Sequence, residues 1–329
     1  MSTPSLNLCV VLSDAKRIIK ANRSHFLALG LLFVLPLSLS AIVYPSFSQP
    51  ASIIFIYNRL LSSSSTPVPD GEISPVDNSD VIFTVLYSLF VLLLSLFTSA
   101  SITHSTWNGF FGRQLNITSS VKSILVSFFP LTVTYVVSLL ILGLIIFAVG
   151  GLAALMYGGI LFWGAQTDFG NVYFPVLVVL LAVLLVGVMI YIQVEWFLAC
   201  VVVVVESKWG FEPLKRSSYL VKGVKWIAFS ILIYFALSIG FLSAFYSSSV
   251  PSYISSGSIS WEFGLPTVLF TVFATALLLY SVVATAVLFI YCKALHGELA
   301  LEMVDEFAPL YVRLPFDGDE KVPKVVYVV

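Results

Sequence analysis

The sequence predicts an all-α, polytopic membrane protein: a six-helix transmembrane bundle with amphipathic cytosolic-face helices that precede spans one, three and five. The first observation behind this fold class is composition. Of the 329 residues, 59% are hydrophobic and only 10% are charged, whereas a soluble domain has roughly 45–50% and about 25%. The second is that the apolar residues gather in stretches of about 18 to 25 residues, the length that a helix needs to cross a bilayer. Together these observations exclude a soluble globular protein.

Six apolar stretches are long enough to be transmembrane helices. They run from about Phe26 to Tyr44, from Val81 to Thr103, from Ile124 to Val149, from near Val172, from Trp226 to Tyr246, and from Phe263 to Cys292. The fourth apolar run continues to Val205, which is too long for one untilted crossing. We therefore expect Val201–Val205 to extend into the cytosolic layer. The stretch from Gly150 to Gly164 either extends span three or dips back as a re-entrant loop.

The basic residues outside the spans predict the orientation of the chain. All of the 16 Lys and Arg residues except Arg59 fall on one side of the six predicted spans, while acidic residues such as Asp70 and Asp168 fall on the other. The positive-inside rule then places both termini in the cytosol. We expect the endoplasmic reticulum or the plasma membrane rather than an organelle reached through a transit peptide. The chain divides into a six-span domain over residues 1–293 and a cytosolic C-terminal tail over residues 294–329.

A short segment with helical periodicity precedes each odd-numbered span. Before span one, Leu8, Val11 and Ala15 fall on one helical face and charged residues fall on the other. The segments 117–128 and 213–224 show the same arrangement before spans three and five. We expect these segments to lie on the inner leaflet and to lead into three helical hairpins. The layout fits a threefold internal repeat as well as it fits the ordinary basic bias of inner loops.

Residues 206–223 carry the most specific motif of the chain. They fit the pattern E-x3-G-x3-L-x-R-S-x2-L-x-K-G, which begins at Glu206 and ends at Gly223. In this motif the chain resembles YciC-like bacterial inner-membrane proteins, the membrane domain attached to some glycerophosphoryl diester phosphodiesterases, and a group of uncharacterised plant multi-pass transmembrane proteins, whose layout fits best. The resemblance implies a six-helix membrane bundle. It implies no activity, because this chain has no phosphodiesterase catalytic domain, and Pro213 stands where the bacterial proteins more often have Ala.

One charged residue lies inside a predicted span. This residue is Glu195, and a carboxylate in the hydrocarbon costs roughly 2.5 kcal/mol or more unless it is paired. Counting from Val172 places Glu195 near the inner boundary of span four. We therefore expect a structural pair with an inner-face Lys or Arg, with a transport or proton-relay role as the alternative.

Further charged residues near the same boundary are candidates for structural or lipid contacts. We expect Arg216 to pair with Glu206 and so to fix the surface helix to the end of span four, with contact to anionic lipid as the competing interpretation. For Lys215, Lys222 and Lys225 we expect contact with anionic headgroups, worth about 1 kcal/mol per basic residue.

The sequence shows no pattern for catalysis or for a cofactor. It contains no nucleophile elbow, phosphate loop or zinc motif, and His25, His104 and His296 lack the spacing of metal ligands. A net charge of −1 gives no basic excess for nucleic acid. We therefore expect a non-catalytic integral membrane protein, without cofactor or metal, that organises lipids or partner proteins at its cytosolic face, or that forms a homo-oligomer. The alternative is a small transporter or channel with a pathway near Glu195.

Overall fold

The computed structural model describes residues 7–47, 78–113, 117–162, 173–254, 261–299, 311–313 and 325–327. Within these ranges the chain is almost entirely helical. The helices are α1 (Leu8–Ala21), α2 (Arg23–Leu29), the π-helix η1 (Gly30–Val34), α3 (Leu35–Phe47), α5 (Asn78–Phe110), α6 (Ile117–Phe162), α7 (Tyr173–Glu195), α8 (Ala199–Glu206), α9 (Glu212–Val221), α10 (Lys225–Ile254) and α11 (Trp261–Leu295). The short strands β1 (Tyr311–Arg313) and β2 (Val325–Tyr327) pair in antiparallel fashion in the C-terminal tail.

Six segments of the described chain are long and apolar enough to cross a membrane. The first is α2, η1 and α3, which follow one another without a break, and the fourth is α7 together with α8; the others are α5, α6, α10 and α11. The predicted all-α, polytopic fold is therefore confirmed, and the chain is a multi-pass membrane protein. Arg59, Asp70 and Asp168, which entered the predicted orientation, lie outside the described residues.

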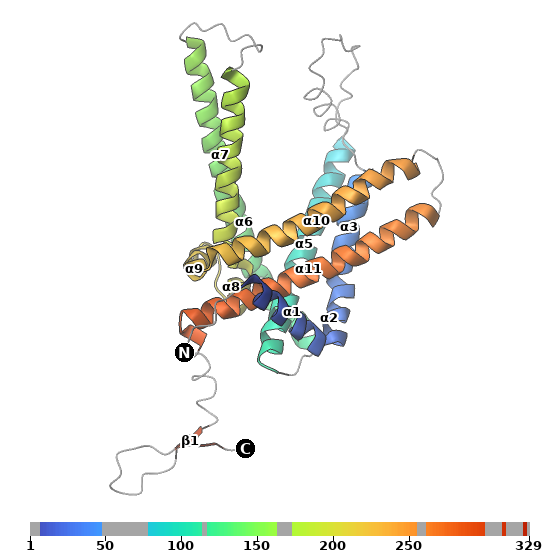
Figure 1. Ribbon diagram of the computed structural model, residues 1–329, viewed down its shortest axis with the longest axis vertical. Coiled ribbons are helices and arrows are strands. Elements are labelled where there is room, and N and C mark those ends of the chain that lie inside the picture. The colour runs from blue at the N-terminus through green and yellow to red at the C-terminus, as the bar shows by residue number, and fades with distance from the viewer. Residues whose placement is uncertain are drawn as a thin grey trace, which may run out of the picture.

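The long helices meet at one end of the molecule and separate toward the other (Figure 1). The α6–α7 hairpin projects from the body, while α10 and α11 run side by side in a different direction. We call the region where α1, α8 and α9 pack against the ends of the long helices the converging end. Its core includes Val11 of α1, Val202 of α8, Leu220 of α9 and Val287 of α11, each with an exposed fraction of 0%.

The amphipathic segments before spans one and five close this core. In α1, Val11 and Ala15 have exposed fractions of 0%, and in α9 Leu214 is 2% and Val221 0% exposed. The polar faces of both helices remain at the surface, as an amphipathic pattern predicts. The apolar faces of α1 and α9 therefore cover the ends of the long helices, and the two helices also mark a boundary of the membrane domain.

The segment before span three is helical but is not a separate helix. It forms the first turns of α6, which runs unbroken from Ile117 to Phe162. Ile124 is 5% exposed and packs against Val203 of α8, whereas the adjacent Leu125 is 77% exposed. Because α6 also continues through residues 150–162, this stretch extends span three instead of dipping back; residues 163 and 164 lie outside the described chain.

Candidate functional site around α9

The site is built on a compact helix–turn–helix made of α8 and α9. Ser207 and Gly210 adopt left-handed backbone conformations, with φ of 53° and 74°, and these turn the chain between the two helices. Pro213 then stands in the first turn of α9, where its missing N–H is not needed. The result is that α9 packs back against α8 and α7.

Buried hydrogen bonds attach α9 to the break between α7 and α8. The hydroxyl of Ser217, which has an exposed fraction of 0%, donates to the backbone oxygen of Glu195 over 2.7 Å and accepts from the backbone N–H of Leu198 over 3.1 Å. Residues 196–198 form the turn at this break. One serine of α9 thus satisfies backbone groups that the interrupted helix leaves unpaired, which fixes the position of α9.

A cluster of ion pairs surrounds Glu206 at the end of α8. The predicted pair with Arg216 of α9 is present, with Nε 3.3 Å from the carboxylate. Lys208 lies 3.6 Å and Lys293 of α11 lies 3.7 Å from the same side chain, of which only 9% is exposed. The ammonium of Lys293 also lies 5.5 Å from the ring centroid of Trp107. Glu206 therefore joins α8, α9 and α11 through one nearly buried carboxylate.

Arg216 also binds the first residues after α11. Its guanidinium donates to the carboxylate of Glu298, and its Cζ lies 5.5 Å from the ring centroid of Tyr219. Gly297, with φ of 74°, ends the helix and turns the chain so that Glu298 reaches α9. The His296 ring contacts the Tyr219 ring in a tilted arrangement, with a centroid separation of 5.0 Å. The beginning of the C-terminal tail is thus docked on α9.

The electrostatic environment keeps Arg216 charged. Partial burial by itself lowers the pKa of the guanidinium, but the hydrogen bond to Glu298 and the nearby carboxylate of Glu206 outweigh that effect and raise the pKa above its ordinary value. The guanidinium of Arg216 therefore keeps its positive charge at neutral and alkaline pH.

Glu195 forms a separate pair on the other side of α9. Its carboxylate accepts from the ammonium of Lys225 and from the hydroxyl of Ser218, and the residue is 7% exposed. The expected partner from the inner-face basic residues is thus present. It follows that Lys225, which we expected to contact lipid, instead provides the counter-ion that a nearly buried carboxylate requires.

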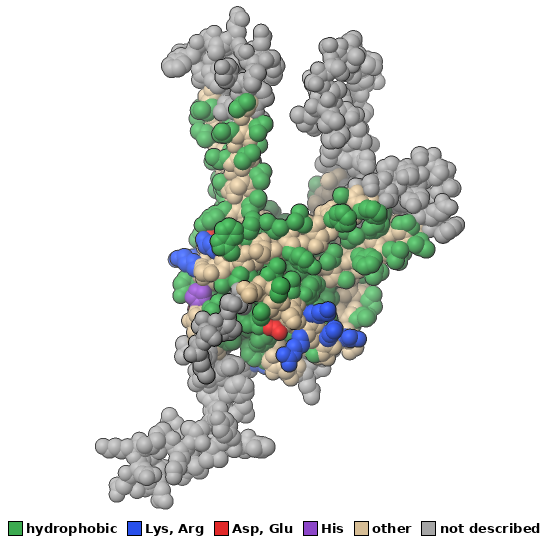
Figure 2. All heavy atoms as spheres, in the orientation of Figure 1, with side chains coloured by type: hydrophobic (Ala, Val, Ile, Leu, Met, Phe, Trp, Pro, Cys, Tyr) green, Lys and Arg blue, Asp and Glu red, His purple; other side chains and the backbone are tan. Residues whose placement is uncertain are grey.

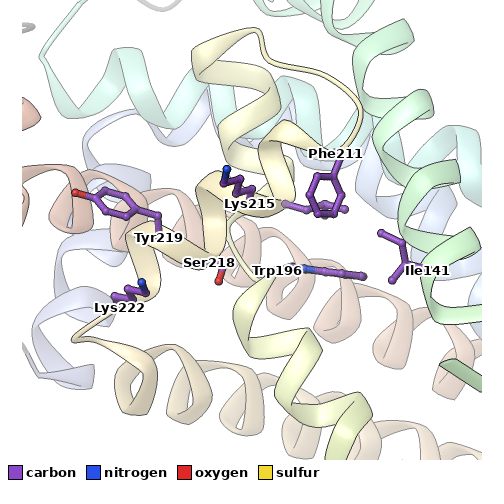
Figure 3. A pocket seen from close by; sticks show the side chains of 8 residues that line it. Ile141, Trp196, Phe211, Lys215, Ser218, Tyr219 and Lys222 are labelled. Atoms are coloured by element: carbon purple, nitrogen blue, oxygen red, sulfur yellow. The ribbon is translucent and has the colours of Figure 1, made fainter. Parts of the chain in front are cut away.

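A groove of about 400 Å³ lies beside α9 and faces α6 (Figure 3). Ile141 of α6, Trp196 of the α7–α8 turn and Phe211 form its apolar side. Lys215, Ser218 and Tyr219 of α9 and Lys222, which follows the end of that helix, line the other side, and Leu214 completes the lining. Lys215 and Lys222 are exposed, and neither forms an ion pair with any acidic side chain of the described residues.

The histidines do not come together. His25 is buried, where its Nε2 lies 3.0 Å from Ser105 Oγ and 3.4 Å from Ser120 Oγ, so it links α2, α5 and α6. His104 lies near Asn108 on α5, and His296 lies against Tyr219. Among the described residues no group of three or more His, Cys, Asp or Glu side chains is arranged to hold a metal ion.

Several residues of the site gave no signal in the sequence. Ser217 belongs to the motif, but nothing in the motif indicates that it caps the break in span four. Lys293 and Glu298 lie more than 80 residues from Glu206, so only the packing of α11 against α8 and α9 brings them to Glu206 and Arg216. The groove depends on Ile141, an ordinary apolar residue of α6, and no pattern predicts its position.

Among the comparisons with known proteins, the match to a family model identifies the family of the chain. No curated protein matches the sequence, and no solved structure matches it. The similarity to YciC-like and plant membrane proteins therefore stays a prediction. Residues 3–306 match the family model described as "Domain of unknown function (DUF8558)", a match that covers α1 through the docked start of the tail; the chain belongs to that family.

Proposed function

We propose that this protein is a non-catalytic membrane protein that organises anionic lipids at the membrane face where its helices converge. The observation that carries the proposal is that some basic side chains between positions 206 and 225 are paired with carboxylates and others are not. Arg216, Lys208 and Lys225 are engaged by carboxylates, whereas Lys215 and Lys222 are exposed beside them without an acidic partner in the described chain. A rigid helix thus presents unneutralised cations to its surroundings.

Exposed aromatic residues support a position of α9 at the membrane interface. Trp209, Phe211 and Trp226 flank α9 and have exposed fractions of 60%, 60% and 80%. Trp and other aromatic side chains favour the headgroup level of a bilayer, where one end of the side chain is apolar and the other is wet. Lys215 and Lys222 would then stand at the depth of lipid phosphates.

A second basic surface lies on α1 and α2. Lys16, Arg17, Lys20 and Arg23 are exposed on the polar face that α1 turns away from the core. Figure 2 shows basic side chains gathered over α1 and α2 and near α9. Because basic residues mark the cytosolic side, we infer that the converging end faces the cytosol, where the leaflet is rich in anionic lipid.

Lipid retention by the full chain tests this proposal. The purified protein in mild detergent is exposed to equal amounts of phosphatidylserine and phosphatidylcholine, and bound lipids are counted by native mass spectrometry. We expect the wild type to retain more phosphatidylserine and to lose the preference as salt rises. A variant with Lys16, Arg17, Lys20 and Arg23 changed to Ala should show a weaker preference. Equal retention of both lipids by the wild type would refute the proposal.

The contacts of Glu195 support a structural role over the alternative of a transport pathway. Both its carboxylate oxygens have partners, Lys225 and Ser218, on segments that pack against α7. Glu195→Gln in proteoliposomes separates the roles: a structural pair predicts a less stable protein with unchanged ion or solute flux. A flux that wild-type protein supports and the stable variant loses would establish the transporter instead.

A further inference from the structure

The groove beside α9 has the features of a binding site for one lipid molecule. We propose that it holds a single anionic phospholipid, with the phosphate at Lys215 and Lys222 and an acyl chain along Ile141, Trp196 and Phe211. This inference rests on the proposed function and deepens it, because it replaces a general attraction for anionic lipid by one defined site. A volume of about 400 Å³ falls within the range of small-molecule sites, roughly 300–1,000 Å³.

The spacing of the two lysines suits one phosphate group. Lys215 lies in α9 and Lys222 directly follows Val221, the last residue of that helix, so the two positions are about 10 Å apart along the helix axis and on nearly the same side. Ser218 lies between them on that face. Long, flexible ammonium side chains at this spacing can reach a common anion from both sides, as lysine does in phosphate sites.

The charges around the groove favour an anion. Two acidic side chains close to the groove lysines already have basic partners: Glu195 is engaged by Lys225 and by the Ser218 hydroxyl, and Glu212 of α9 pairs with Lys208. Glu206 is likewise engaged by Arg216, Lys208 and Lys293. The positive charges of Lys215 and Lys222 are therefore not offset by these carboxylates, and the field in the groove attracts an anion.

The opposite side of the groove identifies the anion as a lipid. Trp196 and Phe211 approach one another beside Ile141, on the side toward α6 (Figure 3). Beyond Ile141 the exposed surface of α6 is apolar, with Leu140 63% and Leu144 67% exposed. A free phosphate ion would leave this apolar side unused, whereas a phospholipid would cover it with its chain while its headgroup reaches the lysines.

Titration of the full chain with phosphatidic acid tests the site. We expect native mass spectrometry to show one tightly bound molecule on the wild type. The double variant Lys215→Ala/Lys222→Ala should bind it about 30-fold more weakly, since each lysine near the surface accounts for about a fivefold change. A charge-matched control, Lys16→Ala/Lys20→Ala, removes two exposed cations from α1 and should keep the tightly bound molecule.

A second pair of variants tests the apolar side without changing charge. Ile141→Trp fills the groove and should displace the acyl chain, whereas Leu144→Trp places the same ring on α6 outside the groove lining and should not. Unfolding temperatures of all variants are compared with that of the wild type. Because none of the substituted side chains is buried, we expect these temperatures to agree.

Each outcome of these titrations decides a different point. If the groove variants and the controls bind phosphatidic acid equally, the defined site is wrong, while a surviving preference for anionic over neutral lipid keeps the proposed function. If no preference for anionic lipid exists at all, the proposed function fails as well. If glycerol 3-phosphate occupies the site as tightly as phosphatidic acid does, the ligand is a free phosphate compound and the lipid assignment is overturned.

Discussion

The converging end and the projecting α6–α7 hairpin both contain apolar stretches, but these stretches have opposite surroundings. Val202 in α8 has an exposed fraction of 0%, whereas Val183 in α7 is 66% exposed. Figure 2 shows hydrophobic side chains along the outside of the hairpin. In a membrane, lipid covers the hairpin and gives little drive for helices to pack, so the protein's own contacts are concentrated at the converging end. Hydropathy alone therefore cannot tell which half of a span is packed.

The ion pairs coincide with the packed region. Glu206, Arg216 and Lys293 join α8, α9 and α11, and these helices also contribute buried side chains to the apolar core of the converging end. Such pairs contribute little net stability relative to apolar residues, but they are costly to break singly and they define one arrangement of the helices. Side-chain packing and ion pairs together therefore hold the helices of the converging end in place, whereas the hairpin is covered by lipid.

The largest effect should follow from removing the carboxylate of Glu206. Glu206→Ala leaves Arg216 and Lys293 without their shared partner in a nearly buried setting, so we expect the free energy of unfolding to fall by about 3 kcal/mol. Denaturant titration in mixed micelles measures it. Glu212→Ala is the control, since that side chain is 62% exposed and pairs, among the described residues, only with Lys208, and it should change stability by less than about 0.5 kcal/mol. Equal losses of unfolding free energy in the two variants would show that the burial of Glu206 does not affect stability.

Arg216 should rank next, with a dependence on pH that identifies its charge. Arg216→Ala is expected to cost about 2 kcal/mol, since Glu206 keeps Lys208 and Lys293. With its pKa raised, wild-type Arg216 keeps its proton, and its contribution to stability stays constant from neutral pH up to about pH 11. In Arg216→Lys the contribution is present at neutral pH and is lost as pH rises beyond about 10.4. A gap between wild type and Arg216→Lys that does not widen at high pH would contradict the ion-pair role.

Paired valine substitutions compare the two regions directly. Val202→Ala creates a cavity in the core of the converging end and should lower the free energy of unfolding by about 1.5 kcal/mol. Val183→Ala removes the same atoms from a surface that lipid or detergent covers, and should change it by less than about 0.5 kcal/mol. Denaturant titrations of both variants give the difference. A larger loss for Val183→Ala would mean that the hairpin is packed by protein and not by lipid.

The smallest effect on stability is expected at the two free lysines. Lys215 and Lys222 are exposed and contribute no ion pair within the described chain, so the double change to Ala should leave the unfolding temperature in neutral detergent within about 2 °C of the wild type. The same variant should lose the extra stability that added phosphatidylserine gives the wild type. Destabilisation in the absence of anionic lipid would make these lysines part of the fold instead.

Much of the fold follows from sequence because insertion depends on local composition. All six spans were expected near their observed positions, and two pairings near the end of span four, Arg216 with Glu206 and Glu195 with a basic residue, follow from the cost of an unpaired charge. These predictions need only the order of residues along one or two neighbouring segments.

Contacts between segments that lie far apart in the sequence could not be predicted from local composition. The partner of Glu195 could be named only as an inner-face cation, and Lys225 instead appeared to be a lipid contact, because several lysines share the same short segment. The docking of Glu298 on Arg216 and the unbroken course of α6 from Ile117 into span three depend on how whole helices pack. Periodicity shows that a segment is amphipathic but not what covers its apolar face.

The central claim is that the end of the molecule held by packing and ion pairs is also the end that binds anionic lipid. Amide hydrogen exchange in nanodiscs, with neutral lipid alone or with phosphatidylserine added, tests it most directly. We predict that anionic lipid increases protection in peptides that cover α9, that Lys215→Ala/Lys222→Ala removes the increase, and that the outer half of α6 does not change. Increased protection at the outer half of α6 with none at α9 would contradict the account.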